Sequence, residues 1–458
     1  MKRNFQLIFK LYMVRSRTFI FFILIIWNLS SVYSQNQFRF DKEEKRAVTL
    51  RFEYINNLII LPALLNGEFI NFLVDTGVNK TKVFAQPKDS TFLDNSEFIS
   101  LRSLGSSEPV KGYKTLGNTI DFGPISGQQQ EVYFITDPRF DLASKLGINV
   151  QGIIGYEFFK DFIFRLNYNR KSLRVYQHDK FNRKLVQFDK TNFRLIRKKP
   201  HIKVPVEFMN GSTKELVFLL DTGSSDAFWV FEDKDLKVPE NSFRDYVGYG
   251  LELAIKGERS KFQSAKIGEY ILEQPRVAYI DSISAQLFTA DRFKDGIIGS
   301  EILRRFVWFF DYKNQNVYLR PSSNFDDNSN YDRSGLLLVY VGEEITKTRI
   351  PVTVKVNKKT NYNALNPENQ FEIRLQISKV LEVNQIRPNS PSSKIDIQVG
   401  DRILKLNGKT VDKMSLEQIN TLLSSEEGKR IKIQLKRGKA ILNRELFLSS
   451  QLNKLPDN

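Results

Sequence analysis

Two Asp-Thr-Gly tripeptides carry the side chains of this chain whose spacing best suits acid–base chemistry. They lie at residues 75–77 and 221–223, and each follows three apolar residues. Hydrolysis of a peptide bond without a metal or a covalent intermediate requires a base that activates water and an acid that protonates the amide nitrogen. Two carboxylates held about 3 Å apart can fill both roles, because they share one proton. The pattern therefore indicates Asp75 and Asp221 as a candidate catalytic pair.

The residues that flank each aspartate fit a rigid pair screened from solvent. The apolar run places the aspartate at the end of a buried strand, the threonine hydroxyl can bond across to the other copy, and the glycine allows close backbone approach. We expect four such supporting residues: Thr76, Gly77, Thr222 and Gly223. Either copy alone is equally compatible with a plain turn in which the aspartate bonds its own backbone. The duplication favours the catalytic interpretation.

The tripeptides belong to an internal repeat. Ile-Ile-Gly occurs at residues 153–155 and again at residues 297–299. The two aspartates are 146 positions apart (221 minus 75), and the two glycines, Gly155 and Gly299, are 144 apart (299 minus 155). A shared offset at two separate places predicts two homologous lobes of similar size. Alternating apolar runs joined by Asn-Gly turns predict that each lobe is mainly β, with one short helix after Ile-Ile-Gly.

The composition argues against several other kinds of site. The 458 residues include no cysteine and two histidines, His178 and His201. Thiol catalysis and disulfides are therefore excluded, and a His-rich metal site is not expected. The formal net charge is +17, but Lys and Arg are dispersed among acidic residues, which is typical of a solvated surface. We expect no metal, no cofactor and no nucleic-acid partner.

The N-terminal segment has the features of a secretory signal. Positive residues precede an apolar stretch at residues 18–29, which is shorter than the roughly 20 residues that span a bilayer. Val32 and Ser34 suit the positions before a cleavage point. We expect a signal peptide at residues 1–34 and a protein that is periplasmic, secreted or associated with the cell surface. An uncleaved N-terminal anchor is the alternative.

The doubled motif resembles the pepsin and retropepsin class of aspartic peptidases over residues 52–321. The resemblance implies a bilobal β fold, a cleft between the lobes for a polypeptide substrate, and a site that one monomer completes. It also implies supporting roles for Gly155 and Gly299 beneath the catalytic loops. Ser224 stands where the family has a Ser or Thr that bonds the outer carboxylate oxygen, whereas the first copy departs from the pattern with Val78.

The resemblance further implies a flap, a hairpin with glycine that closes over the substrate. We favour a hairpin in the second lobe because of its glycines and tyrosines: Tyr246, Gly248, Tyr249 and Gly250. The alternative is residues 104–106 in the first lobe, and a simple loop between strands is compatible with both segments.

A separate domain is expected after a polar segment that reads as a linker. Its Gly-Asp and Asn-Gly turns and an amphipathic helix at residues 416–423 resemble a bacterial PDZ domain. PDZ domains bind peptide C-termini or extended strands by adding a strand beside that helix, so the resemblance implies recruitment of a substrate or partner. The alternative is a domain that packs against the lobes or tethers the enzyme.

The expected fold is therefore mainly β, with two retropepsin-like lobes and a small α+β PDZ-like domain. The expected divisions are a signal peptide (1–34), a first lobe (45–178), a second lobe (195–321), a linker (322–335) and a PDZ-like domain (336–450). The expected function is that of an exported aspartic endopeptidase. A catalytically inactive peptide-binding adaptor with the same fold is the competing hypothesis.

Overall fold

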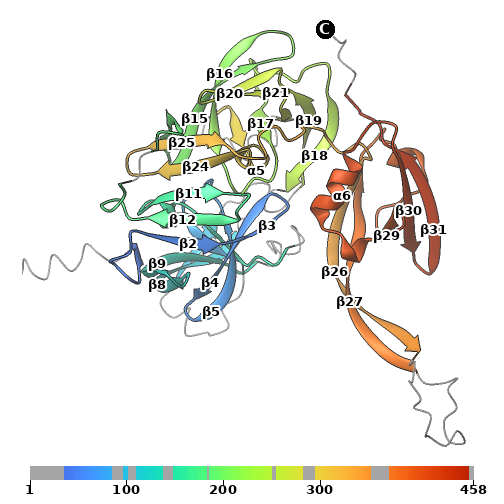
Figure 1. Cartoon of the computed structure of the whole chain (residues 1–458), viewed down its shortest axis with the longest axis horizontal. Helices are drawn as coiled ribbons and strands as arrows, with labels where there is room; N and C mark the ends of the chain where they lie inside the picture. The colour runs from blue at the N-terminus through green and yellow to red at the C-terminus, as the bar shows by residue number, and fades with distance from the viewer. Residues whose placement is uncertain are drawn as a thin grey trace, which may run out of the picture.

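The computed structural model shows two β lobes with a smaller domain beside the second of them (Figure 1). It describes the following residues: 36–84, 96–101, 110–137, 148–182, 185–249, 254–281, 294–351 and 371–452. Strands dominate this part of the chain, which confirms the predicted mainly β fold. None of the described helices is long and apolar enough to cross a membrane.

The first lobe is built on one sheet, which brings β5 and β10 together as parallel neighbours. Its strands are β1 (Phe38–Phe40), β3 (Glu53–Ile55), β4 (Leu58–Leu65), β5 (Glu68–Val74), β6 (Thr81–Val83), β7 (Glu97–Leu101), β8 (Val110–Asp121), β9 (Ile125–Ile135) and β10 (Gly152–Ile154). Strands β4 and β5 join through Asn66-Gly67, where both residues have positive φ as a tight hairpin turn requires. Val74 pairs with Ile154 at the end of β5. This pairing sets the position of Asp75.

The second lobe repeats the arrangement on its own sheet. Its strands are β14 (Arg194–Ile196), β15 (Lys199–Glu207), β16 (Thr213–Leu220), β17 (Phe228–Phe231), β18 (Phe243–Tyr249), β19 (Ala254–Lys261), β20 (Ser264–Ile267), β21 (Tyr270–Glu273), β22 (Arg276–Ile280) and β23 (Gly296–Ile298). Leu220 of β16 pairs in parallel with Ile298 of β23. The Asn210-Gly211 turn is wider than its counterpart, since the Phe208 N–H donates to the Ser212 carbonyl at 2.8 Å.

A third sheet is shared by both lobes and joins them. It runs in the order β13 (Asp189–Asn192), β25 (Asn316–Pro321), β24 (Phe306–Asp311), β11 (Ile163–Asn167), β12 (Ser172–Tyr176) and β2 (Ala47–Arg51). All six residues of β24 are buried, as expected for a strand covered on both faces. Phe164 of β11 stacks on Phe310 of β24 at a ring-centroid distance of 4.9 Å. The two lobes therefore form one continuous hydrophobic core.

Each Ile-Ile-Gly segment leads into one short helix, as the repeat predicts. These helices are α3 (Tyr156–Phe159) and α5 (Ser300–Leu303). Both lie directly beneath an Asp-Thr-Gly loop, because the N–H of Tyr156 donates to the Val78 carbonyl at 3.1 Å and that of Ser300 to the Ser224 carbonyl at 2.7 Å.

The C-terminal domain has its own core, separate from that of the lobes. Its elements are β26 (Leu336–Pro351), β27 (Phe371–Ile386), β28 (Arg402–Leu406), β29 (Lys409–Thr410), α6 (Leu416–Leu423), β30 (Arg430–Arg437) and β31 (Ala440–Phe447), with single 3-10 turns at Ser392–Lys394 and Val411–Lys413. The predicted helix at residues 416–423 is confirmed as α6. Ser415 and Gln418 form a capping box at its start. The long β26–β27 hairpin projects away from the domain (Figure 1).

The segment expected as a linker lies against the second lobe. The Tyr331 hydroxyl donates to the Ser260 carbonyl at 2.5 Å and accepts from the Val277 N–H at 3.0 Å. The Tyr331 ring also packs edge-on against Phe243, with centroids 5.3 Å apart. This segment therefore seats the C-terminal domain on the lobe instead of letting it hang free.

Candidate active site

Each candidate catalytic aspartate follows a buried strand of its own lobe. Asp75 comes after β5 and Asp221 after β16, and the N–H of each donates at 2.9 Å to the isoleucine carbonyl that ends β10 or β23. Each carboxylate Oδ1 accepts from the N–H of the glycine two residues on, at 2.6 Å from Gly77 and 2.9 Å from Gly223. The strand end and the turn together fix the direction of both side chains.

The two threonines join the loops across the lobe boundary. The Thr76 N–H donates to Thr222 Oγ1 at 3.1 Å, and the Thr222 N–H donates to Thr76 Oγ1 at 3.0 Å. Each hydroxyl then donates to the opposite strand, Thr76 to the Leu220 carbonyl at 2.7 Å and Thr222 to the Val74 carbonyl at 2.8 Å. Both threonines are 1% exposed. The loops are thus held by a symmetric, buried set of hydrogen bonds, which is the bracing expected from the sequence.

The glycines of the two motifs bring the carboxylates together. A Cβ added to Gly77 would lie 2.8 Å from Asp221 Oδ2, and one added to Gly223 would lie 2.3 Å from Asp75 Cγ. Each carboxylate therefore packs against the backbone of the opposite loop, where only glycine leaves room. Asp75 and Asp221, predicted from two distant places in the sequence, form one site.

The surroundings of Asp75 favour its protonated form. Burial, followed by the charge of Asp221 and a hydrogen bond with it, raises the pKa of Asp75 well above its ordinary value. The N–H of Gly77 and the charge of Lys199 act in the opposite direction but are weaker. A carboxyl that stays protonated beside a charged neighbour can act as an acid while the neighbour acts as a base.

The glycines of Ile-Ile-Gly support the loops from below. A Cβ on Gly155 would lie 2.4 Å from the carbonyls of Asp75 and Val78, and one on Gly299 would lie 2.3 Å from the Asp226 carbonyl. Real Cβ atoms do not approach backbone oxygens so closely, so any larger residue would push the loops away.

Ser224 and Val78 occupy matching places and differ in what they offer. The Ser224 Oγ lies 2.8 Å from the place that a Cβ on Gly299 would take. Among the described residues, no hydrogen bond runs from this Oγ to Asp221, so its role beside the carboxylate stays a prediction. Val78 packs with the apolar side chains of the first lobe.

The candidate flap corresponds to a hairpin made by β18 and β19. Tyr246 and Gly248 lie within β18 and Tyr249 ends it, whereas Gly250 and the alternative segment 104–106 lie outside the described residues. Val247 of β18 and Ile255 of β19 pack in one cluster with Trp229. The hairpin therefore rests on β17, the strand that follows the second catalytic loop. Closure over a substrate stays a prediction.

Three residues near the second catalytic loop were missed by the sequence reasoning. Asp226 accepts hydrogen bonds from Trp229 Nε1 at 2.9 Å and Arg259 Nη1 at 2.7 Å. Burial raises the pKa of the Asp226 carboxyl, but the charges of Arg259 and Arg276 outweigh it and lower the pKa overall. The repeat already pointed to Asp226, because the fifth residue after the aspartate is Asp226 in the second copy but Lys80 in the first, so the two copies carry opposite charges there.

A lysine near the first aspartate was also missed. Lys82 of β6 pairs with Ile153 of β10. In the second lobe, Trp229 of β17 occupies the equivalent position and pairs with Ile297 of β23. Burial lowers the pKa of the Lys82 ammonium, and the charge of Asp75 opposes this change. The two halves of the site are therefore chemically different, with a cation beside β10 in one and an indole beside β23 in the other.

Two lobes with facing Asp-Thr-Gly loops define the type of site found in aspartic peptidases. Family comparison agrees, since residues 61–158 match the model of aspartyl proteases and residues 382–437 match that of PDZ domains. The first match lies within the first lobe, and the repeat geometry extends the likeness to the second. The chain thus contains an aspartyl-protease-like domain and a PDZ domain.

Solved structures also match this chain, among them an aspartic proteinase. No curated protein matches the sequence. The crystal structure of an aspartic proteinase from Irpex lacteus is 13% identical, and the match covers 62% of this chain and 100% of that one with a TM-score of 0.39.

Proposed function

We propose that this protein is an aspartic endopeptidase in which Asp75 and Asp221 activate one water molecule between them. The observation that carries the proposal is the close packing of the two carboxylates across the lobe boundary, where each meets the glycine of the opposite loop. The ionised member takes a proton from water while the protonated member donates to the carbonyl oxygen of the substrate. Both roles reverse when the intermediate collapses and the amine leaves.

The proposed activity includes a pH limit. Turnover needs one proton on the pair, and the raised pKa of Asp75 keeps that proton in place at pH values where an ordinary aspartate has lost it. Activity should fall as the pH rises through this pKa, because the second carboxyl then ionises. It should also fall at strongly acidic pH, where both carboxyls are protonated.

We further propose that the protein is exported and that the PDZ domain recruits its substrate or partner. Export is supported by the basic and apolar pattern of residues 1–34, all of which lie outside the described part. Recruitment is supported by the family match at residues 382–437 and by α6, beside which PDZ domains add an extended peptide strand.

The decisive experiment is cleavage of a mixed peptide library between pH 4 and pH 7 by the protein that begins at Gln35. Asp75→Asn and Asp221→Asn should each lower kcat/KM by about a thousandfold or more, because neither single carboxyl can serve as both acid and base. Asp121→Asn is the matched control, since Asp121 also accepts from the N–H two residues on, Gly123, at 2.6 Å but ends β8, outside the two Asp-Thr-Gly loops. A folded wild-type protein that cleaves nothing would favour the peptide-binding adaptor.

A further inference from the structure

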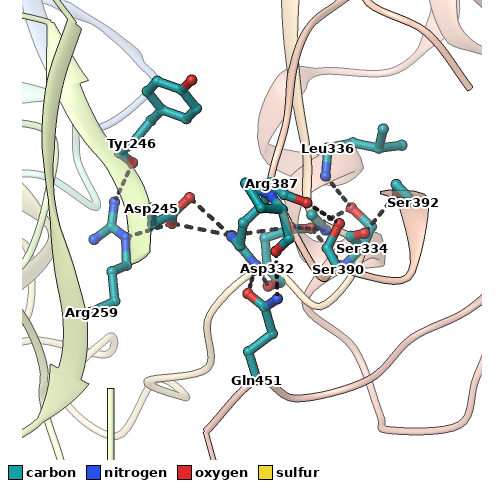
Figure 2. Close-up of polar contacts among 12 residues, drawn as sticks. Asp245, Tyr246, Arg259, Asp332, Ser334, Leu336, Arg387, Ser390, Ser392 and Gln451 are labelled. Atoms are coloured by element: carbon teal, nitrogen blue, oxygen red, sulfur yellow. Dashed lines mark hydrogen bonds and ion pairs between the residues drawn. The ribbon is translucent and has the colours of Figure 1, made fainter. Parts of the chain in front are cut away.

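Four charged side chains of alternating sign link the second Asp-Thr-Gly loop to the C-terminal domain. Figure 2 shows the part of this series from Arg259 through Asp245 to Arg387. Asp226 pairs with Arg259 at 2.7 Å, Arg259 with Asp245 at 2.8 Å, and Asp245 with Arg387 at 2.9 Å. Asp226 follows the catalytic Asp221 by five residues, Asp245 and Arg259 lie on β18 and β19, and Arg387 follows β27. The series therefore crosses the candidate flap hairpin on its way between two domains.

The Arg387 guanidinium is held in one orientation. Its Nε and Nη2 donate to the two oxygens of Asp245 at 2.9 and 3.1 Å, and its Nη1 donates to the Asp332 carbonyl at 3.0 Å and to Gln451 Oε1 at 3.2 Å. The guanidinium also lies over the Phe243 ring, 4.8 Å from its centroid. A planar fork that bonds a carboxylate through two parallel contacts fixes direction as well as distance.

The C-terminal domain holds the backbone of Arg387 equally firmly. The Arg387 N–H donates to the Gly335 carbonyl at 2.8 Å, and the Ser390 hydroxyl donates to the Arg387 carbonyl at 2.7 Å. Gly335 is fixed in turn, because its N–H donates to Asp332 Oδ2 at 2.6 Å. Residue 387 is thus a rigid part of the domain at the end of β27, and Figure 2 shows its side chain reaching toward the hairpin.

At the other end, Asp226 is built into the catalytic loop. Its side chain accepts from Ala227 N and Trp229 Nε1, both at 2.9 Å, and its carbonyl accepts from the Glu301 N–H at 3.2 Å. The same carbonyl lies against Gly299, beneath the loop. A shift of Arg259 would therefore move both the hairpin and the support of the loop that carries Asp221.

The side chains of the series are largely shielded from water. The exposed fractions are 11% for Asp226, 12% for Arg259, 11% for Asp245 and 8% for Arg387. Ion pairs that are shielded in this way are screened little by salt, and removing one partner affects the rest. Exposed pairs, by contrast, contribute little.

We propose that Arg387 is a positioning residue for the active site, which holds the β18–β19 hairpin and, through Arg259 and Asp226, the second catalytic loop from within the PDZ domain. The part that concerns turnover rests on the proposed peptidase function. The PDZ domain then completes the substrate side of the site, besides any role in recruitment. Arg387 acts through Asp245 and touches neither the carboxylate pair nor the substrate.

The first test compares the kinetics of Arg387→Gln, Arg387→Lys and Asp245→Asn in the protein that begins at Gln35. Arg387→Gln should lower kcat/KM by about tenfold, mainly through a higher KM, because the hairpin is displaced while the carboxylate pair stays intact. Arg387→Lys should retain part of the activity, since lysine keeps the charge but not the fork. Arg402→Gln is the control, because Arg402 pairs with Glu344 inside the same domain at 3.3 Å and is 43% exposed.

A double variant separates positioning from general damage. The double variant Arg387→Gln/Asp245→Asn should lose no more kcat/KM than the more affected single variant, because both changes break the same Arg387–Asp245 contact. Additive losses, or wild-type kinetics for Arg387→Gln, would overturn the proposal. A loss equal to that of Arg402→Gln would overturn it as well.

Hydrogen exchange tests the positioning role without relying on turnover. Backbone amides of β18 and β19 should exchange about tenfold faster in Arg387→Gln than in the wild type, while amides of β4 and β5 in the first lobe should be unchanged. This result would support positioning even if the wild type cleaves no peptide, in which case only the peptidase function fails. Unchanged exchange in the hairpin would refute the positioning role in an active enzyme too.

Discussion

The two lobes use the same framework but treat the charges around it in opposite ways. In lobe one, Lys80 pairs with Glu131 at 2.6 Å, Glu131 with Lys114 at 3.6 Å, and Lys114 with Glu97 at 3.5 Å. In lobe two the series begins at Asp226, which also stands five residues after the aspartate, and it carries the opposite sign at every step. Both series start beside an Asp-Thr-Gly loop and reach a pair of antiparallel strands, β7 and β8 in the first lobe and β18 and β19 in the second.

Solvent exposure separates the two series. Lys80 is 32% exposed and Glu97, at the outer end, is 69% exposed, whereas Arg387 at the outer end of the other series is 8% exposed. The lobe-one series ends in solvent, and the lobe-two series ends in another domain. The comparison teaches that the duplicated framework tolerates either sign of charge. Contact with the C-terminal domain shields the second series from water, so its ion pairs should contribute more to stability than those of the first.

The largest contrast is expected between Asp226 and Lys80. Asp226→Asn should lower the free energy of unfolding by about 3 kcal/mol, because it weakens a shielded ion pair and leaves the charge of Arg259 less compensated. Lys80→Met should lower it by less than about 1 kcal/mol, because the Lys80–Glu131 pair is less shielded from water and Glu131 keeps Lys114 as a partner. Urea unfolding of both variants measures the difference. Equal losses would show that the exposure of the two series does not determine their contribution.

A second contrast concerns the glycines of the two catalytic loops. Gly223→Ala should lower kcat by about a hundredfold, since a Cβ 2.3 Å from Asp75 Cγ must displace that carboxylate by about 1 Å. Gly77→Ala should cost less, because its Cβ would stay 2.8 Å from the nearest atom of Asp221. Steady-state kinetics on one peptide substrate test the order, and circular dichroism confirms that both variants are folded. A larger loss for Gly77→Ala would contradict the packing described above.

A smaller contrast is expected beside the short helices. Asp161 follows α3 at the position where Arg305 follows α5. Arg305 pairs with Glu301 of its own helix at 2.8 Å, whereas Asp161 accepts a hydrogen bond from the Phe38 N–H at 3.2 Å. Burial raises the pKa of Asp161 from 3.8 to about 6. The folded state therefore binds this proton more tightly than the unfolded state, so Asp161 makes stability fall as the pH rises from about 4 to about 6.

Unfolding in urea at several pH values measures this effect. Asp161→Asn should remove about 2 kcal/mol of the decrease between pH 4 and pH 7, because asparagine does not titrate and can still accept from the Phe38 N–H. The half-buried Asp121, at the end of β8, provides the control variant Asp121→Asn, which should leave the pH dependence as it is. An unaltered slope in Asp161→Asn would show that other groups cause it.

The parts of the molecule that could be predicted from the sequence are those fixed by local spacing. The Asp-Thr-Gly loops, the Ile-Ile-Gly supports and the helix at residues 416–423 each depend on a few neighbouring residues of characteristic type. The repeat then placed the two aspartates in equivalent positions. Their meeting followed from symmetry and needed no knowledge of distant contacts.

The parts that escaped prediction depend on contacts between distant residues of ordinary type. Asp245 and Arg387 are 142 positions apart, and each looks like a solvated surface charge in its own segment. Tyr331 is a single aromatic residue in a polar stretch, so the stretch reads as a linker although Tyr331 is only 9% exposed. The strand β13, at Asp189–Asn192, alternates no apolar residues and gains its place only by pairing with β25.

The sheet shared by the lobes has a consequence for the order of synthesis. Strands β11 and β12 leave the ribosome long before β24 and β25, which complete their sheet. Until then the edge of β11 has no neighbour, and Phe164 lacks the ring of Phe310 on which it stacks. A nascent chain that ends just after β12 contains Asp75 but not yet Asp221. Asp221 takes its position beside β23, which leaves the ribosome shortly before β24, so the carboxylate pair and the shared sheet are both completed late in synthesis.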